Sequence, residues 1–152
     1  MENLKPASGR FAGGVHYFPV RVYFEDTDLS GIVYHANYLR FMERARSDML
    51  RLVGIDQRAA VESGDGVYAV THVELNYRRS AHMEDELTVV SRVGRVSAAT
   101  VTIEQTIMRG EDLISNGEIS VAFLSPAGRA KRQPREWVDL FNRIAQGEDI
   151  CP

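Results

Sequence analysis

The sequence is nearly devoid of cysteine, since Cys151 is the only one among its 152 residues and lies next to the C-terminus. An intrachain disulfide framework is therefore excluded, and a reducing, cytoplasmic location is expected. No apolar run approaches the ~20 residues that a membrane-spanning helix needs. The first fifteen residues also lack the apolar core of a signal peptide. We expect neither secretion nor a membrane span, and we interpret residues 1–15 as a flexible N-terminal lead-in.

A large excess of charge of one sign is also absent, because 18 basic and 21 acidic residues give a formal net charge of -3. No global field attracts nucleic acid, so we expect no nucleic-acid partner. Apolar residues make up 44% of the chain and charged residues 26%, the balance of a globular protein. This length fits one domain, which we place at residues 16–133, followed by a C-terminal helix and tail at residues 134–152.

One segment has the periodicity of a long helix. Apolar residues recur at three- and four-residue steps, namely Leu39, Met42, Ala45, Met49 and Val53. They predict an amphipathic helix of roughly five turns. Gly54 is suited to end it. The other face of this helix carries Arg40, Glu43, Arg44, Asp48 and Arg51.

Alternation of apolar and polar residues predicts strands on both sides of that helix. Before it, the alternation runs from Phe18 to Phe24. After it, alternation marks residues 73–77, 87–93, 101–107 and 119–123, with a turn at residues 109–112. Asn116-Gly117 is a hairpin signal taken alone. The flanking segments are too short for two strands, so we interpret the pair as a bulge within one long strand.

Together these patterns predict an α+β fold, in which an antiparallel sheet of about five strands wraps around one long central helix. Pro134 opens a short C-terminal helix whose apolar stripe is Trp137, Leu140, Phe141 and Ile144. The sheet keeps exposed edges. Pairing of edges between copies is therefore expected, giving a homodimer or higher oligomer.

The polar loop between the first strand and the helix carries the candidate chemistry. Asp28 and His35 lie just before the helix begins. Unpaired N–H groups at a helix N-terminus can stabilise a carbonyl oxygen as it becomes negative. Asp28 could attack the carbonyl as a nucleophile, or take a proton from water as a general base.

Simpler roles compete for these residues. Aspartates are also common as turn and helix-capping residues, and we assign Asp26 to loop structure. Tyr34 and Tyr38 are expected to bury their rings beside the helix start. The spacing of the carboxylates and His35 matches no zinc or calcium pattern, so no metal is expected.

The run from Asp26 to Tyr38 reads Asp-Thr-Asp-x-x-Gly-x-Val-Tyr-His-x-x-Tyr. With its preceding strand and following helix, it resembles the 4-hydroxybenzoyl-CoA thioesterase-like hotdog family. The Tyr-His pair and Glu43-Arg44-Ala45-Arg46 look most like the Tol-Pal-associated acyl-CoA thioesterases. The likeness extends from about Phe18 to about Pro134. One departure lies at residues 78–82, where relatives often carry a proline.

The resemblance implies a site and an assembly. Asp28 would be the catalytic carboxylate, and the backbone N–H of His35 would polarise the carbonyl. Subunits would pair through their sheets into dimers, commonly joined into tetramers, with each acyl-CoA site between subunits. An acyl carrier protein or the Tol-Pal system would be a possible partner.

Coenzyme A is here part of the substrate, and no separate cofactor is expected. Its phosphates need donors, yet the chain has neither a Gly-rich dinucleotide fingerprint nor a P-loop. Guanidinium groups suit phosphate oxygens. We therefore nominate Arg78, Arg79, Arg129, Lys131 and Arg132 as CoA-binding residues.

Two other functions stay open. A hotdog dehydratase acting on 3-hydroxyacyl thioesters needs a histidine and an acidic residue in different motifs, for which residues 16–19 offer only superficial support. A non-catalytic module for acyl-CoA or acyl carrier protein would bind without turnover. Glu43 could be mistaken for the helix carboxylate of some hotdog enzymes, but pairing with a helix arginine is the simpler account.

Overall fold

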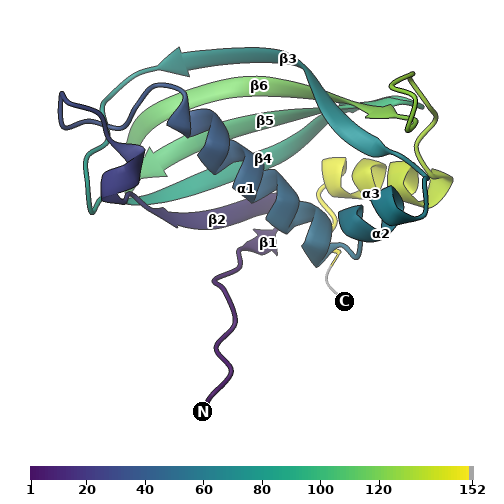
Figure 1. The fold of residues 1–152 in the computed structure, drawn as a ribbon, viewed down its shortest axis with the longest axis horizontal. Coiled ribbons are helices and arrows are strands. Elements are labelled where there is room, and N and C mark those ends of the chain that lie inside the picture. The colour runs from purple at the N-terminus through teal and green to yellow at the C-terminus, as the bar shows by residue number, and fades with distance from the viewer. Residues whose placement is uncertain (151–152) are drawn as a thin grey trace.

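A six-stranded antiparallel sheet curves around one long helix, α1 (Asn37–Leu52), in the computed structural model, which describes residues 1–150 (Figure 1). Two shorter helices, α2 (Gln57–Glu62) and α3 (Arg135–Ala145), lie toward one end of the sheet. Cys151, on which the expectation of a reducing compartment rests, lies outside the described residues. The predicted α+β architecture is confirmed, with six strands in place of about five.

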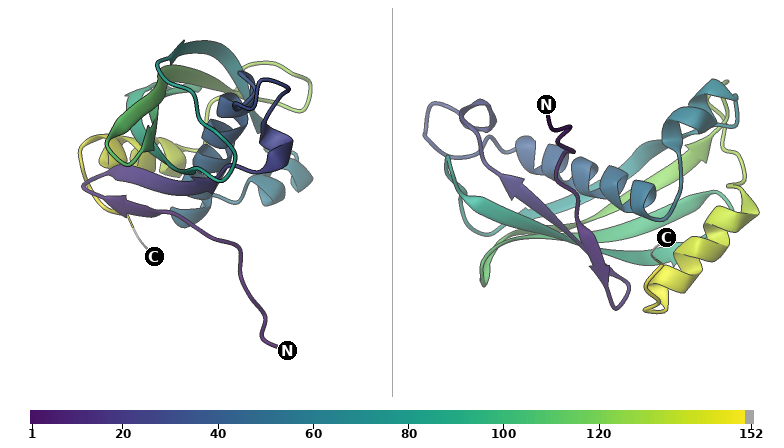
Figure 2. Two further views of the ribbon diagram at one scale, coloured as in Figure 1. Left: turned by 90° about the vertical axis from the view of Figure 1, so that its left-hand side faces the viewer. Right: turned by 90° about the horizontal axis from the view of Figure 1, so that it is seen from below.

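The strands are β1 (Arg10–Ala12), β2 (Val15–Arg21), β3 (Val67–Tyr77), β4 (Glu86–Val96), β5 (Thr100–Arg109) and β6 (Asp112–Leu124). Their order across the sheet is β1-β2-β4-β5-β6-β3, so β1 and β3 form its two edges. All neighbouring strands are antiparallel. Figure 2 shows how the sheet bends around α1. Among residues 1–150, no helix is both long and apolar enough to cross a membrane.

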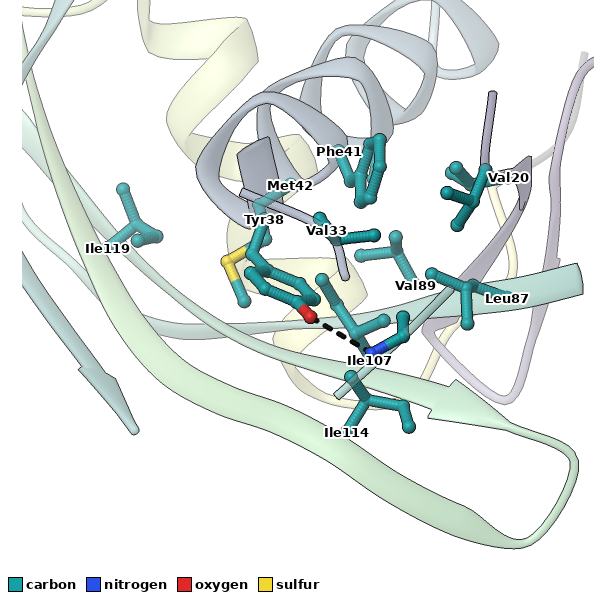
Figure 3. Close-up of a cluster of buried hydrophobic side chains, with 13 residues drawn as sticks. Val20, Val33, Tyr38, Phe41, Met42, Leu87, Val89, Ile107, Ile114 and Ile119 are labelled. Carbon is teal, nitrogen blue, oxygen red and sulfur yellow. Dashed lines mark hydrogen bonds between the residues drawn. The ribbon is translucent and has the colours of Figure 1, made fainter. Parts of the chain in front are cut away.

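The apolar stripe of α1 packs on the concave face of the sheet. Phe41, Met42 and Ala45 are fully buried, and Met49 follows one turn later. Phe41 and Met42 meet inward side chains of β4, such as Leu87 and Val89, in the cluster of Figure 3. Met49 belongs to a second buried cluster farther along the helix. Burying an apolar side chain of this size stabilises a fold by about 1.5–3 kcal/mol. This shared burial fixes α1 against the sheet, and therefore fixes where the helix begins.

The N-terminal segment departs from the prediction. Residues 1–15 are not all a lead-in, because Arg10–Ala12 pairs with β2 and Phe11 is buried. The Gly9 N–H and the Ser8 hydroxyl also donate to Asp48, at 2.9 and 2.6 Å. A strand of three residues is too short for alternation to reveal it.

The prediction that Asp48 lies on the polar face of the helix is wrong. It is 1% exposed and its Oδ2 lies 2.8 Å from Nε2 of the buried His16. Burial lowers the pKa of His16, even though Asp48 opposes the shift. His16 is thus a core residue bonded to the helix, and the segment it begins gives no support to a dehydratase.

Strand boundaries and irregularities were only partly predicted. β6 is one long strand, as expected. Its register shift against β5 lies at Ile114, which has no partner there. The predicted bulge at Asn116-Gly117 is therefore wrong in position, because these two residues pair regularly. The predicted first strand extends too far, because β2 ends at Arg21 and Phe24 lies in a 3-10 turn, 80% exposed. The turn between β5 and β6 is confirmed, with Gly110 at φ 59.

Candidate active site

Asp26 holds the loop that leads from β2 to α1. Its buried carboxylate accepts the Tyr23 N–H at 2.8 Å and the Asn37 side-chain amide at 2.6 Å. Its backbone carbonyl accepts the Tyr34 N–H at 2.9 Å. Because Asn37 is the first residue of α1, Asp26 ties the loop to the helix start. Its assignment to loop structure is confirmed.

Asp28 follows two residues later and is exposed. Its Oδ1 accepts the Ser30 N–H at 2.8 Å and a short hydrogen bond from the Ser30 hydroxyl. The Ser30 hydroxyl, then its N–H, lowers the pKa of Asp28, and the charge of His35 acts in the same direction. Oδ2 accepts no hydrogen bond from residues 1–150. Asp28 is therefore an ionised carboxylate at neutral pH with one oxygen free.

This carboxylate lines a groove of about 390 Å³ at the N-terminal end of α1. The ribbon of Figure 1 shows that β3 ends near this end of the helix. The lining brings together segments that are far apart in the sequence. Its residues are Asp28, Ile32, Val33, His35, Tyr38, Tyr77, Arg78, Arg79 and Ser80. The structure thus assembles four of the seven predicted site residues in one groove.

The turn before α1 supplies free backbone donors. Within residues 1–150, the N–H groups of His35 and Ala36 have no protein acceptor, whereas the next N–H, of Asn37, bonds to the Tyr34 carbonyl at 2.8 Å. No side chain caps this helix end. Its positive dipole end and unpaired donors therefore remain available to an oxygen that becomes negative.

Tyr77 fixes the same turn from the other side of the groove. Its hydroxyl donates to the His35 carbonyl at 2.8 Å. Sequence reasoning missed both Tyr77 and Ser30. A serine two residues after an aspartate is a recognisable turn signal, whereas only the fold brings the end of β3 to His35.

The two tyrosines of the motif behave differently. Tyr38 is buried, and its hydroxyl accepts the Ala81 N–H at 3.2 Å (Figure 3). Burial raises the pKa of Tyr38. Its packing role is confirmed. Tyr34 is 45% exposed with its ring against His35, so the expectation that it is buried is wrong.

The predicted CoA-binding residues fall into two groups. Arg78 and Arg79 lie in the groove, where Arg79 pairs with Asp112 at 2.9 Å and Arg78 makes only a long 3.3 Å bond to Asn116. Each guanidinium thus has one N–H donor engaged, but within residues 1–150 only Arg79 has an anionic partner, so the charge of Arg78 is the one left unpaired for a phosphate.

Arg129, Lys131 and Arg132 lie at the opposite end of the sheet, in the segment after β6. β3 and β6 pair from Tyr77 opposite Ser115 to Val67 opposite Leu124. At ~3.3 Å per residue, this separates the two groups by roughly 30 Å. One chain alone therefore does not bring the five basic residues together, because β6 carries the chain away from the groove.

A curved antiparallel sheet around one helix, with a free carboxylate beside the unpaired donors at that helix's N-terminus, is the architecture of a hotdog thioesterase. The family model of the thioesterase superfamily matches residues 30–115, so the chain belongs to that superfamily.

Individual relatives agree with this membership. The chain is 41% identical over 105 residues to acyl-CoA thioesterase YbgC of Haemophilus influenzae, covering 69% of this chain and 77% of that protein. It is 34% identical over 119 residues to acyl-CoA thioester hydrolase YbgC of Escherichia coli O6:H1, covering 78% and 86%. The crystal structure of a probable thioesterase from Bartonella henselae superposes with a TM-score of 0.72 at 37% identity, covering 79% of this chain and 98% of that one.

Proposed function

We propose that this protein hydrolyses acyl-CoA thioesters to the free acid and CoA, with Asp28 acting directly at the thioester carbonyl. The observation that carries the proposal is the free Oδ2 of Asp28 in the same groove as the unpaired His35 N–H. The thioesterase superfamily and the acyl-CoA thioesterase relatives support the reaction class.

The groove offers both halves of the reaction. The thioester oxygen would accept hydrogen bonds from the His35 and Ala36 N–H groups, which stabilise the developing oxyanion. Asp28 would then attack the carbonyl carbon, which forms a mixed anhydride and releases the CoA thiolate. Water later hydrolyses the anhydride to the free acid and regenerates Asp28. In the other route, Asp28 takes the proton of an attacking water, and that proton ends on the departing thiolate.

A second copy of the chain would complete the CoA site. β3 is an exposed edge strand with half-exposed apolar residues, including Val70 and Val73. Antiparallel pairing of two β3 edges would set the start of one strand beside the end of the other. The partner's basic segment at residues 129–132 would then approach the groove that holds Arg78. We propose such sheet-paired dimers, joined into tetramers, while a link to an acyl carrier protein or the Tol-Pal system stays a prediction of the resemblance.

Release of free thiol from a panel of short, long and aromatic acyl-CoAs tests the proposed reaction. Hydrolysis predicts stoichiometric thiol and acid with at least one member of the panel. Loss of water from a 3-hydroxyacyl-CoA without thiol release would instead indicate the dehydratase, and tight binding without turnover would indicate a binding module.

Rapid-mixing kinetics separate the two routes of the proposal. If Asp28 is a nucleophile and breakdown of the anhydride is slow, the first turnover releases a burst of thiol equal to the number of sites. The general-base route releases thiol and acid together from the first turnover.

A further inference from the structure

An ion pair joins the end of β5 to the loop between β3 and β4. Arg109, the last residue of β5, donates from its Nη1 to Oδ2 of Asp85 at 2.8 Å. The same nitrogen donates to the backbone carbonyl of Ser80 at 3.1 Å. Ser80 lines the Asp28 groove, whereas Arg109 and Asp85 do not. We call these two bonds the Arg109 clamp, because they join both ends of the segment from Ser80 to Asp85.

Little else fixes the backbone at Ser80. Within residues 1–150, the Ser80 carbonyl accepts only the Arg109 bond, and the Ser80 N–H has no protein acceptor. Residues 78–85 contain neither proline nor glycine. Glu84, with φ 73, is nevertheless the one non-glycine residue of the described chain at positive φ. Such a conformation is unfavourable and persists only where neighbouring contacts determine it, and the Arg109 clamp supplies such contacts.

The ion pair of the clamp stays charged at neutral pH. Burial acts to raise the pKa of Asp85, but hydrogen bonds from the His82 N–H and from Arg109 outweigh it and lower the pKa overall. The His82 N–H donates to the same Oδ2 at 2.8 Å. The Arg109 and Asp85 side chains are 31% and 24% exposed, so water screens this pair less than a fully exposed one. The clamp therefore orders both Ser80 and His82.

The clamped segment pairs with the turn that carries Asp28. Ile32 and His82 form a β-bridge, and the Val33 N–H donates to the Ala81 carbonyl at 2.8 Å. The Ile32 carbonyl in turn accepts the Asp28 N–H at 3.0 Å. A continuous set of backbone hydrogen bonds thus runs from the catalytic candidate to the loop after β3.

The other end of this loop is held independently of the clamp. The N–H groups of Arg78 and Arg79 both donate to the Ile114 carbonyl of β6, at 2.8 and 3.1 Å. The loop therefore has two anchors. β6 fixes the residues proposed to bind CoA, and Arg109 fixes the residues that pair with the Asp28 turn.

We propose that Arg109 is a positioning residue for thioester hydrolysis, which through its clamp on Ser80 and Asp85 keeps the Asp28 carboxylate aligned with the donors at the start of α1. The inference rests on the proposed function, because it assigns Arg109 a part in that reaction. Arg109 acts through the loop, without lining the groove. Loss of the clamp should therefore lower kcat, which depends on alignment, and leave KM nearly unchanged, because the anchor of Arg78 on β6 remains.

Steady-state thiol release from acyl-CoA by the full-length protein tests the inference. Arg109→Met keeps a long side chain without donors, and its kcat should fall about 5–30-fold with KM within about twofold of the parent value. Arg109→Lys keeps the charge and several donors, so it should recover most of the lost kcat. Asp85→Asn should lower kcat by about 3–10-fold. The double variant Arg109→Met/Asp85→Asn should be no slower than Arg109→Met, because both residues act through one clamp.

Arg143→Met is the matched control. Arg143 pairs with Glu148 at 2.8 Å and lies on α3, which contributes no residue to the groove. This variant also loses one arginine ion pair and should keep the parent kcat. Urea unfolding of every variant gives the folded fraction under assay conditions, so kcat is compared per folded molecule. If Arg109→Met does not fold, Asp85→Asn carries the same test, since it leaves Arg109 in place.

Two kinds of failure are distinguishable. An active parent protein whose Arg109→Met and Asp85→Asn variants keep the parent kcat, or lose activity through KM alone, would overturn the inference and leave the proposed function standing. A loss of rate that only follows the unfolded fraction would do the same. A parent protein that releases no thiol from any acyl-CoA would overturn the proposed function and the inference with it.

Discussion

The Tyr77 hydroxyl donates a 2.8 Å hydrogen bond to the backbone carbonyl of His35. This contact joins the last residue of the edge strand β3 to the turn that opens α1. The His35 carbonyl shares a peptide unit with the Ala36 N–H, one of the two N–H groups of this turn that have no acceptor within residues 1–150. A displacement of Tyr77 at the edge of the sheet would therefore move the backbone donors proposed to bind the thioester oxygen.

Tyr77→Phe should loosen this turn without unfolding the protein. Tyr77 is half exposed, so loss of its hydrogen bond should cost at most about 1 kcal/mol of unfolding free energy. A less ordered donor should lower kcat/KM by about 3–10-fold. Urea unfolding and thiol-release kinetics measure the two effects. Tyr34→Phe is the control, because the Tyr34 hydroxyl makes no hydrogen bond within residues 1–150, and equal rate losses in both variants would contradict the account.

Ser30→Ala should shift the pH dependence of the reaction. Ser30 lowers the pKa of Asp28 in the folded protein, so removing its hydroxyl raises that pKa toward its ordinary value. Because the reaction needs the anion, the acidic limb of kcat/KM should move to higher pH, with little change above neutrality. Ser80→Ala, in the same groove but not bonded to Asp28, should leave the limb in place. An unmoved limb in Ser30→Ala would show that Asp28 is not the group titrating there.

Periodicity predicted the helix and the sheet well, because burial decides both. The residues that repeat along α1 are the ones that touch the sheet, and Met42 and Ala45 are fully buried. Periodicity could not show that Asp48 also points inward. That position depends on His16 in β2, a partner 32 residues away.

The site was predictable where it is local in sequence and obscure where the fold assembles it. Asp28 and His35 belong to one motif and lie in one groove. Arg78 joins them only because β3 runs back along α1. Arg129 looked equivalent as a basic residue after a strand, yet antiparallel pairing places it at the far end. Charge and spacing alone do not reveal at which end of the sheet the loop after a strand lies.

Arg78→Gln should weaken binding of the nucleotide part of the substrate. With acyl-CoA, KM should rise about 5–20-fold with little change in kcat, because a phosphate contact is lost. With an acyl-N-acetylcysteamine thioester, which has no phosphate, KM should stay the same. Arg129→Gln should behave similarly if the partner's basic segment reaches the groove. Arg92→Gln, on the exposed part of β4, serves as the control, and a KM increase with both thioesters would rule out phosphate binding by Arg78.

Val73→Asp should disrupt pairing of the β3 edges. Val73 is 40% exposed on this strand, and a charge on each facing strand opposes association. Light scattering on the eluting protein should give two or four times 17.1 kDa for the parent chain and 17.1 kDa for the variant. A parent chain that elutes as a monomer at assay concentration, with full activity, would contradict the shared site.

The most direct measurement is the turnover of acyl-CoA by Asp28→Asn. This substitution keeps the size of the side chain and removes its charge, and Asp28 is exposed, so unfolding by urea should not change. We predict a fall in kcat of about 100- to 10,000-fold with substrate binding retained, while Glu25→Gln, an exposed neighbour in the same loop, turns over normally. Turnover of Asp28→Asn within a few fold of the parent enzyme would contradict the role given to this carboxylate.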